Sequence, residues 1–359
     1  MLTSVSHENN FNLIRLLAAL QVAVVHAINH FGFDFPGFEL LKLIPGVPTF
    51  FFISGYLIYQ SYDRTRHRGL GSFAINRVLR IYPALIVCTA VALAAVWLTG
   101  YFRSHPVSTG HFMAWVGSQI TFFQFYNPDF MREFGTGVLN GALWTVSVEL
   151  QFYVLIPILF SLLNRFPVIA ALLFMVSLAV NLYVRQFLEW ELLWMKLLYV
   201  SFLPWLYMFM LGACLASFPS WRERFLRPNG VLLFAAFCLT MLLVGSYRMN
   251  ASNGINPISF VILAAMILKL SQARLPLPVS MTAFIRKEDF SYGLYLYHMP
   301  TINVLLALGF VASVANVFIT LLVSFAAALL SWFLIERPAL RHKRYASPAQ
   351  VRPGRESLP

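Results

Sequence analysis

Four ionisable side chains lie inside long apolar stretches of this sequence, where an ionisable group is costly and requires a compensating interaction. Arg15 and His26 share one stretch, Glu149 lies well inside another, and His298 lies in a late one. A carboxylate beside a histidine favours general base catalysis, because it orients the imidazole and stabilises its charged form. A structural polar pair that joins two helices is the alternative interpretation of His26 and Glu149.

The rise of a helix gives each of these side chains an expected depth. At about 1.5 Å per residue, Arg15 lies about 6 Å into its stretch and His26 about 16 Å further along. Glu149 lies about 12 Å into its own stretch, which is expected to start at the outer face of the membrane. We therefore expect Glu149 to meet His26, which is expected in the outer half. His298 is expected in the inner half, nearer the level of Arg15. Arg15 itself either belongs to this site or extends to the lipid headgroups.

Two arginines, Arg77 and Arg80, lie three residues apart and therefore share one face of a helix. They precede the apolar stretch that begins near Tyr82. Arginine binds phosphate through bidentate hydrogen bonds, so the pair is a candidate phosphate site at the mouth of that helix. Ordinary positive charge at the cytoplasmic end of a span is the alternative interpretation.

The composition of the chain is that of a membrane protein. Of its 359 residues 59% are apolar, and the mean hydropathy is +0.71. Only 11% are charged, against roughly a quarter in a soluble domain. These values exclude a disordered chain, a nucleic-acid-binding module and a secreted disulfide scaffold. The three cysteines lie in apolar stretches without a CxxC pair, which gives no disulfide or metal signal.

Ten apolar stretches are long enough to cross a bilayer, at about 20 residues each. They are Phe11–Phe31, Ile44–Ser61, Tyr82–Thr99, Gly141–Leu163, Pro167–Gln186, Leu197–Ser217, Val231–Tyr247, Asn256–Leu270, Ser291–Val311 and Ser313–Ile335. The predicted fold is therefore an all-α polytopic membrane helix bundle of about ten transmembrane helices over residues 11–335. Residues 1–10 form a short N-terminal segment, and residues 336–359 form a basic tail. A shorter apolar piece at 111–125 is expected to be interfacial or re-entrant, within an excursion over 100–140.

The distribution of positive charge predicts the orientation of the bundle. Cytoplasmic loops of membrane proteins carry an excess of Lys and Arg. With ten spans and a cytoplasmic N-terminus, 18 of the 26 Lys and Arg residues fall in cytoplasmic segments and 5 in outer ones. We therefore expect a multi-pass inner-membrane (cell-membrane) protein with both termini in the cytoplasm and the 100–140 excursion outside.

Six short motifs resemble those of the acyltransferase-3 family of integral membrane acyltransferases, and they follow the order of that family over nearly the whole chain. They are Arg15-X10-His26, Phe51-Phe52-Ile53-Ser54-Gly55, Arg77-Val78-Leu79-Arg80, Trp144–Tyr153, Ser291–His298 and Ile335-Glu336-Arg337-Pro338. The resemblance implies an O-acetyltransferase that moves an acyl group, most often acetyl, from coenzyme A to a hydroxyl. The implied acceptor is a glycan of the cell envelope, such as a surface polysaccharide or a lipid-linked saccharide.

The resemblance also implies roles for single residues. Arg77 and Arg80, with Arg15, would hold acetyl-CoA from the cytosolic side. His26 would deprotonate the acceptor hydroxyl with Glu149 orienting it, or would itself carry the acyl group. Further candidate contacts of the donor and of the developing oxyanion are Ser54, Tyr295 and His298.

Two other function classes remain open at this point. A secondary transporter or flippase of a glycan or small molecule is compatible with intramembrane charge and prolines in helices, although the sequence shows no inverted repeat. A non-catalytic scaffold of a polysaccharide assembly complex is the other class. The expected partners are acyl-coenzyme A, a saccharide acceptor and membrane lipids, without a metal or nucleic acid.

Overall fold

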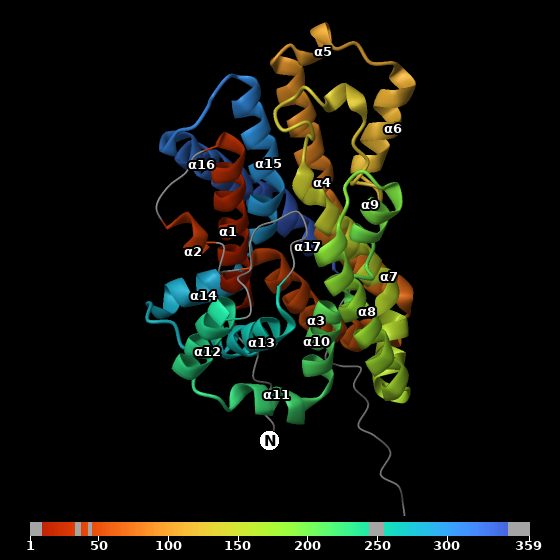
Figure 1. The fold of residues 1–359 in the computed structure, drawn as a ribbon, viewed down its shortest axis with the longest axis vertical. Helices are drawn as coiled ribbons and strands as arrows, with labels where there is room; N and C mark the ends of the chain where they lie inside the picture. Colours follow the sequence, from red (N-terminus) through yellow and green to blue (C-terminus); the bar gives the residue numbers. More distant parts are fainter. Residues whose placement is uncertain (1–8, 33–36, 42–44, 244–254, 344–359) are drawn as a thin grey trace, which may run out of the picture.

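The computed structural model describes residues 9–32, 37–41, 45–243 and 255–343 (Figure 1). Every regular element in these residues is a helix. Five helices are long and apolar enough to cross a membrane, or up to six if the pair α11 and α12, bent by 84°, forms one broken span. The predicted all-α membrane bundle is confirmed, whereas the number of ten spans stays a prediction.

The helices differ widely in length. The longer ones are α1 (Phe11–Phe31), α3 (Gly46–Thr65), α4 (Leu70–Leu98), α6 (Thr109–Gln119), α7 (Trp144–Arg165), α8 (Pro167–Phe187), α10 (Leu206–Ser217), α12 (Gly230–Leu243), α13 (Pro257–Ser271), α15 (Ser291–Ala307) and α16 (Val314–Ser331). The shorter ones are α2 (Phe38–Leu41), α5 (Tyr101–Ser104), α9 (Leu193–Tyr199), α11 (Pro219–Leu226), α14 (Val279–Lys287) and α17 (Arg337–Leu340). Short 3-10 turns precede α4 (Arg66–Arg68) and α7 (Gly141–Leu143), another is Asp129–Met131, and a π-helical turn, Trp332–Glu336, joins α16 to α17.

Several helix boundaries differ from the predicted spans. The predicted span Leu197–Ser217 is divided into α9 and α10, and Pro204 lies in the break, where its missing N–H and its ring interrupt helical hydrogen bonding. The last helix continues to Leu340, beyond the predicted end at Ile335. Residues 1–8 of the predicted N-terminal segment (1–10), residues 344–359 of the predicted tail (336–359) and the end of the predicted span Val231–Tyr247 lie outside the described residues.

The excursion between α4 and α7 is fixed to the bundle by Asn303 on α15. Its Nδ2 donates to the carbonyl oxygens of Val138 and Leu139 at 2.8 and 2.9 Å, and its Oδ1 accepts from the backbone N–H of Thr136 at 2.7 Å. Within the excursion α6 has 11 residues, about 16 Å, roughly half of the hydrocarbon thickness of a bilayer. This length agrees with the expectation that the apolar piece at 111–125 does not cross the membrane.

Helices α3 and α10 cross with their backbones in contact. A Cβ on Gly55 would lie 1.9 Å from the carbonyl oxygen of Phe209, and a Cβ on Gly212 would lie 2.2 Å from the carbonyl oxygen of Phe52. Small residues allow this approach between membrane helices. Gly55 is therefore a packing residue, and the crossing positions the neighbouring Ser54.

We expect Gly55→Ala to prevent accumulation of the folded protein, because the added methyl meets a backbone oxygen that no side-chain rotation can move. Overpacking of this kind costs about 1–3 kcal/mol or more. Gly71→Ala is the matched control, since nothing lies within 4 Å of a Cβ at that position. Membrane abundance and the melting temperature in detergent measure the effect. Equal values for the two variants would show that the crossing tolerates a methyl group.

Candidate active site

An ion-pair network lies where α1, α4 and the start of α15 come together. Nη1 of Arg15 donates to Oδ2 of Asp289 over 2.6 Å, and Nη2 of Arg80 pairs with the same oxygen. Nη1 of Arg80 also lies 3.5 Å from Oε2 of Glu336. The other oxygen of Asp289 accepts from the backbone N–H and the hydroxyl of Ser291, at 3.2 and 2.5 Å. One carboxylate thus joins two arginines from distant parts of the chain.

Asp289 remains ionised within this network. Burial raises the pKa of its carboxyl, but Arg15 and Arg80, together with the two hydrogen bonds from Ser291, outweigh that effect and hold the pKa at about 2. Sequence reasoning missed Asp289 and Glu336 because both stand at the ends of predicted spans, where a carboxylate is normally hydrated. The available signal was their position in the sequence. Asp289 stands two residues before the motif that begins at Ser291, and Glu336 lies inside the motif that ends at Pro338.

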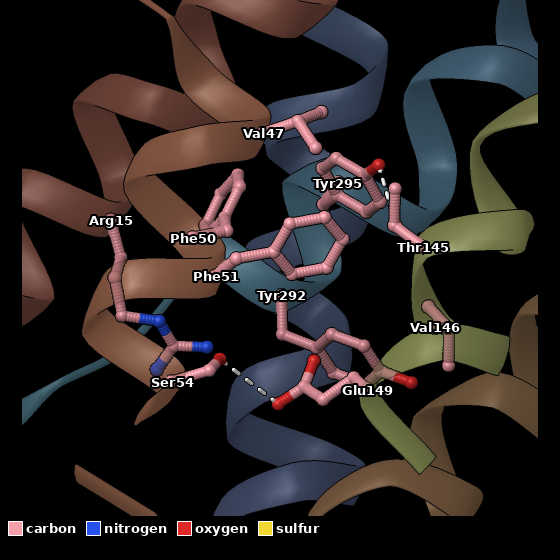
Figure 2. A pocket seen from close by; sticks show the side chains of 10 residues that line it. All are labelled: Arg15, Val47, Phe50, Phe51, Ser54, Thr145, Val146, Glu149, Tyr292 and Tyr295. Atoms are coloured by element: carbon pink, nitrogen blue, oxygen red, sulfur yellow. Dashed lines mark hydrogen bonds between the residues drawn. The ribbon is translucent and has the colours of Figure 1, made fainter. Parts of the chain in front are cut away.

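A small cavity of about 30 Å³ lies among α1, α3, α7 and α15, with room for about one water molecule. Glu149 accepts hydrogen bonds from the Tyr153 hydroxyl at 2.6 Å and from Oγ of Ser54 at 3.4 Å. The hydroxyls of Thr145 and Tyr295, also in the wall, hydrogen-bond to each other at 2.8 Å, and Figure 2 shows both groups around the same space. The remaining wall residues are Arg15, Val47, Phe50, Phe51, Val146 and Tyr292. The structure therefore brings four of the predicted site residues, those at positions 15, 54, 149 and 295, into one pocket.

The histidines at positions 26 and 298 form a hydrogen-bonded pair beside this pocket. Nδ1 of His26 lies 2.9 Å from Nε2 of His298, and Nδ1 of His298 lies 2.8 Å from the carbonyl oxygen of Tyr295. A carbonyl oxygen only accepts, so Nδ1 of His298 carries a hydrogen and donates to it. In the neutral pair, Nε2 of His298 then accepts from Nδ1–H of His26. The lone pair of His26 is thereby fixed on its Nε2.

The predicted contact between His26 and Glu149 is wrong. Among the described residues no hydrogen bond or ion pair joins them, and the partner of His26 is His298. The predicted inner level of His298 is wrong for the same reason. The pairing is between two imidazoles, with the carboxylate in a separate part of the site.

The level of His298 follows from where α15 begins. The depth estimate assumes that each helix starts at the membrane surface, but Ser291 is fully buried and the preceding Asp289 pairs with Arg15, so α15 starts inside the bundle. Helices α1 and α15 run in parallel from this ion pair. The rise from Arg15 to His26 is about 16 Å and that from Asp289 to His298 about 14 Å. The two histidines therefore arrive at the same level.

Arg77 and Arg80 have different surroundings despite sharing a helix face. Nη2 of Arg77 donates to Oγ of Ser61 at 3.0 Å, and its guanidinium lies 5.5 and 5.6 Å from the ring centres of Phe73 and Tyr153. Its Nε is buried without a hydrogen-bond partner in the part of the chain that the structure describes. Arg80 is neutralised by carboxylates, whereas Arg77 has no carboxylate partner in the part of the chain that the structure describes.

Lys343 adds a third cation at this end of the bundle, just after α17. Burial lowers the pKa of its ammonium, and the nearby charges of Arg77 and Arg80 lower it further, to about 7, against the opposing effect of Asp289. The region around these side chains is therefore electropositive even with its carboxylates in place. Sequence reasoning assigned Lys343 to a basic tail and missed this position.

The arrangement combines a histidine of fixed tautomer, a pocket with hydroxyls and a guanidinium, and an electropositive region beyond it. An imidazole lone pair suits removal of a proton from a hydroxyl. Hydroxyl and guanidinium donors suit stabilisation of an oxyanion. Fixed cations suit recognition of phosphate groups.

Comparison with known proteins agrees with this chemistry. The model of a family described as an acyltransferase domain, acyltransferase 3, matches residues 8–336. Nodulation protein 10 of Rhizobium leguminosarum bv. viciae is 32% identical over 94% of this chain and 95% of its own length. The O-acetyl transferase of Shigella phage Sf6 is 27% identical over 92% of this chain and 96% of its own. The O-acetyltransferase OatA of Staphylococcus aureus matches 37% of this chain at 32% identity and 23% of its own length. No solved structure matches. The chain belongs to the acyltransferase 3 family of acyltransferases.

Proposed function

We propose that this acyltransferase moves an acetyl group from cytosolic acetyl-CoA to a hydroxyl of a cell-surface glycan or lipid-linked saccharide. The observation that carries the proposal is the fixed tautomer of His26, which aims one imidazole lone pair away from His298. Two relatives whose names describe them as O-acetyltransferases support the choice of a hydroxyl acceptor.

In the proposed reaction Nε2 of His26 removes the proton of the acceptor hydroxyl. The oxygen bonds to the thioester carbonyl carbon, the C–S bond breaks, and the thiolate leaves and receives the proton from the imidazolium. Each turnover therefore yields one ester and one thiol. The oxyanion that develops lies within reach of a donor from the wall of the pocket, for which Tyr295 is the candidate, because its ring lies 5.6 Å from that of His298.

The donor's phosphates are assigned to the electropositive end of the bundle. Arg77 has no carboxylate partner among the described residues, and its charge lowers the pKa of Lys343, so the two cations act on the same region. Arg80 is proposed to act through Asp289, which also holds Arg15 at the pocket. Ser54 and Glu149 line the same pocket as Arg15 and would contact the pantetheine or the acyl group.

This assignment predicts a pH-dependent affinity for the donor. Bound phosphate favours the charged form of Lys343 and raises its pKa, so the KM for acetyl-CoA should be lowest below about pH 7 and should rise above it. The total rise should be about tenfold or more, the value of one charge-assisted contact of roughly 1.5–3 kcal/mol. Lys343→Gln should remove this rise, and Lys343→Arg should keep the low KM to higher pH. The same pH profile in Lys343→Gln and in the unchanged enzyme would assign the effect to the donor's own phosphate.

The proposed function is tested in vesicles of known orientation. A cysteine placed at Asp129, whose side chain is fully exposed in the excursion, reports sidedness through a membrane-impermeant label. Radiolabelled acetyl-CoA should be used only from the face opposite to that label, with acetyl esters appearing on saccharide at the labelled face. Use of the donor from the labelled face would overturn the orientation. Loss of thioester without any ester product would overturn the choice of acceptor.

A further inference from the structure

A second and larger cavity of about 880 Å³ lies between the excursion and α9; we call it the excursion cavity. Its walls come from residues 124–144 and 190–200 and from His30 of α1. The ring of His30 lies edge-on to that of His26, with centres 5.9 Å apart. On the far side of the histidine pair, the ring of Tyr295 in the small pocket lies 5.6 Å from that of His298. The two cavities therefore approach the same histidine pair from different sides.

Aromatic side chains form one wall of the excursion cavity. The ring of Tyr199 lies 4.7 Å from that of Trp144 and 5.2 Å from that of Trp190, measured between centres. Trp190 is 41% exposed, so part of its ring is available to a ligand, while Tyr199 is buried. Rigid aromatic faces are suited to packing against the C–H faces of sugar rings.

A buried amide that also lines the cavity has unused hydrogen-bonding capacity. Gln124 is 1% exposed, and its Oε1 accepts from Oγ of Ser147 at 3.0 Å. Its Nε2 has no hydrogen-bond partner among the described residues. A buried donor is costly to leave unpaired, and a ligand oxygen in this cavity would satisfy it.

The charged groups of the cavity wall are cations. Lys196 and Arg132 line it, and no aspartate or glutamate does. Arg132 donates to the carbonyl oxygen of Asn127 at 3.0 Å and lies 3.8 Å from the exposed Asp129. Lys196 forms no ion pair within the described ranges and is exposed on α9. The wall thus complements a negatively charged ligand.

We propose that the excursion cavity is the acceptor site and that it selects a saccharide carrying an anionic group, either a uronate carboxylate or a phosphate. Lys196 pairs with the anion, Trp190 stacks on a sugar ring, and Gln124 donates to a sugar oxygen. The hydroxyl to be acylated then extends past His30 towards His26. This inference depends on the proposed function for the identification of the ligand as acceptor.

Equilibrium binding to the purified full-length protein tests this site without requiring turnover. The probes are three fluorescently labelled tetrasaccharides: galacturonate, neutral galactose, and galactose with a terminal phosphate. Lys196→Gln and Trp190→Ala are compared with two matched controls that lie outside the cavity wall. These are Lys287→Gln on α14 and Trp194→Ala, which is 51% exposed on the same short helix as Lys196. Coenzyme A binding is measured in parallel on each variant.

The unchanged protein should bind at least one anionic probe more tightly than the neutral one, and the stronger of the two identifies the anion. Lys196→Gln should weaken the binding of that probe about tenfold or more and leave the binding of the neutral probe unchanged. Trp190→Ala should weaken the binding of all three probes. Neither control variant should change probe binding, and no variant should change the binding of coenzyme A. Equal affinity for charged and neutral probes, or no effect of either variant, would overturn the inference. If the probes bind as stated but coenzyme A does not, the saccharide site stands and the proposed acyl transfer fails.

Discussion

His26→Ala is expected to reduce acyl transfer by about 10²–10⁴-fold, the usual contribution of a positioned general base. Nε2 of His26 is the nitrogen whose lone pair the hydrogen-bond chain leaves available. Acetyl transfer is measured in membranes at matched protein levels, with His67→Ala, at an exposed histidine, as the control. Residual activity above about a tenth would exclude proton transfer by His26 and return the pair to a structural role.

Substitutions of His298, the partner of His26, test the same prediction in a second way. His298→Ala removes the acceptor that fixes the tautomer, so it should lower activity strongly, and the double variant should be little worse than His26→Ala, because residues that act as a unit are not additive. His298→Gln offers a carbonyl oxygen near the position of Nε2 and should restore part of the activity. Glu149→Gln should act independently of both, since Glu149 bonds to Ser54 and Tyr153 instead. Additive losses for the two histidines would contradict a relay.

The contents of the site could be predicted from the sequence, but not its pairings. Motif order and intramembrane polarity were sufficient to select His26, Glu149 and Tyr295 as site residues, and the structure places Glu149 and Tyr295 around one pocket and His26 beside it. The partner of His26 could not be found from helix rise alone, because the rise measures distance along a helix and gives no starting level. That level is set by the ion pair of Asp289, a contact between residues 274 positions apart.

The same limit applies to the charges. Counting residues by segment treats Arg80 and Lys343 alike as cytoplasmic positive charge, yet one is neutralised by buried carboxylates and the other has a lowered pKa. Gly55 could be recognised as part of a motif, but its role in the α3–α10 crossing depends on a backbone oxygen of Phe209. The length and apolarity of each stretch predicted the helices and the bundle, because burial against neighbours or lipid is a property of each stretch. The contacts between stretches could be found only from the three-dimensional structure.

Asp289→Asn is expected to be the most damaging single change to folding outside the helix crossings. The substitution keeps the shape of the side chain but removes the carboxylate partner of Arg15 and leaves Arg80 with only the 3.5 Å contact to Glu336. Breaking a buried pair in this way costs about 3–5 kcal/mol. That is a large share of a typical total stability of about 5–15 kcal/mol. Because the pKa of Asp289 is about 2, its stabilising effect is present above the unfolded value near 3.9 and is lost only as the pH falls through about 2. At any working pH the substitution therefore removes a full charge.

A surface ion pair provides the matched control for this change. Asp63 pairs with Arg66 at 2.9 Å, but both side chains are about half exposed, and such pairs contribute about 0–1 kcal/mol. Asp63→Asn should therefore leave the melting temperature in detergent unchanged, while Asp289→Asn should lower it strongly or prevent accumulation. Adding Arg80→Met to Asp289→Asn should recover stability, because it removes one of the two cations that lost their partner. If the double variant is less stable than Asp289→Asn alone, Arg80 is held by Glu336 and Asp289 does not organise the network.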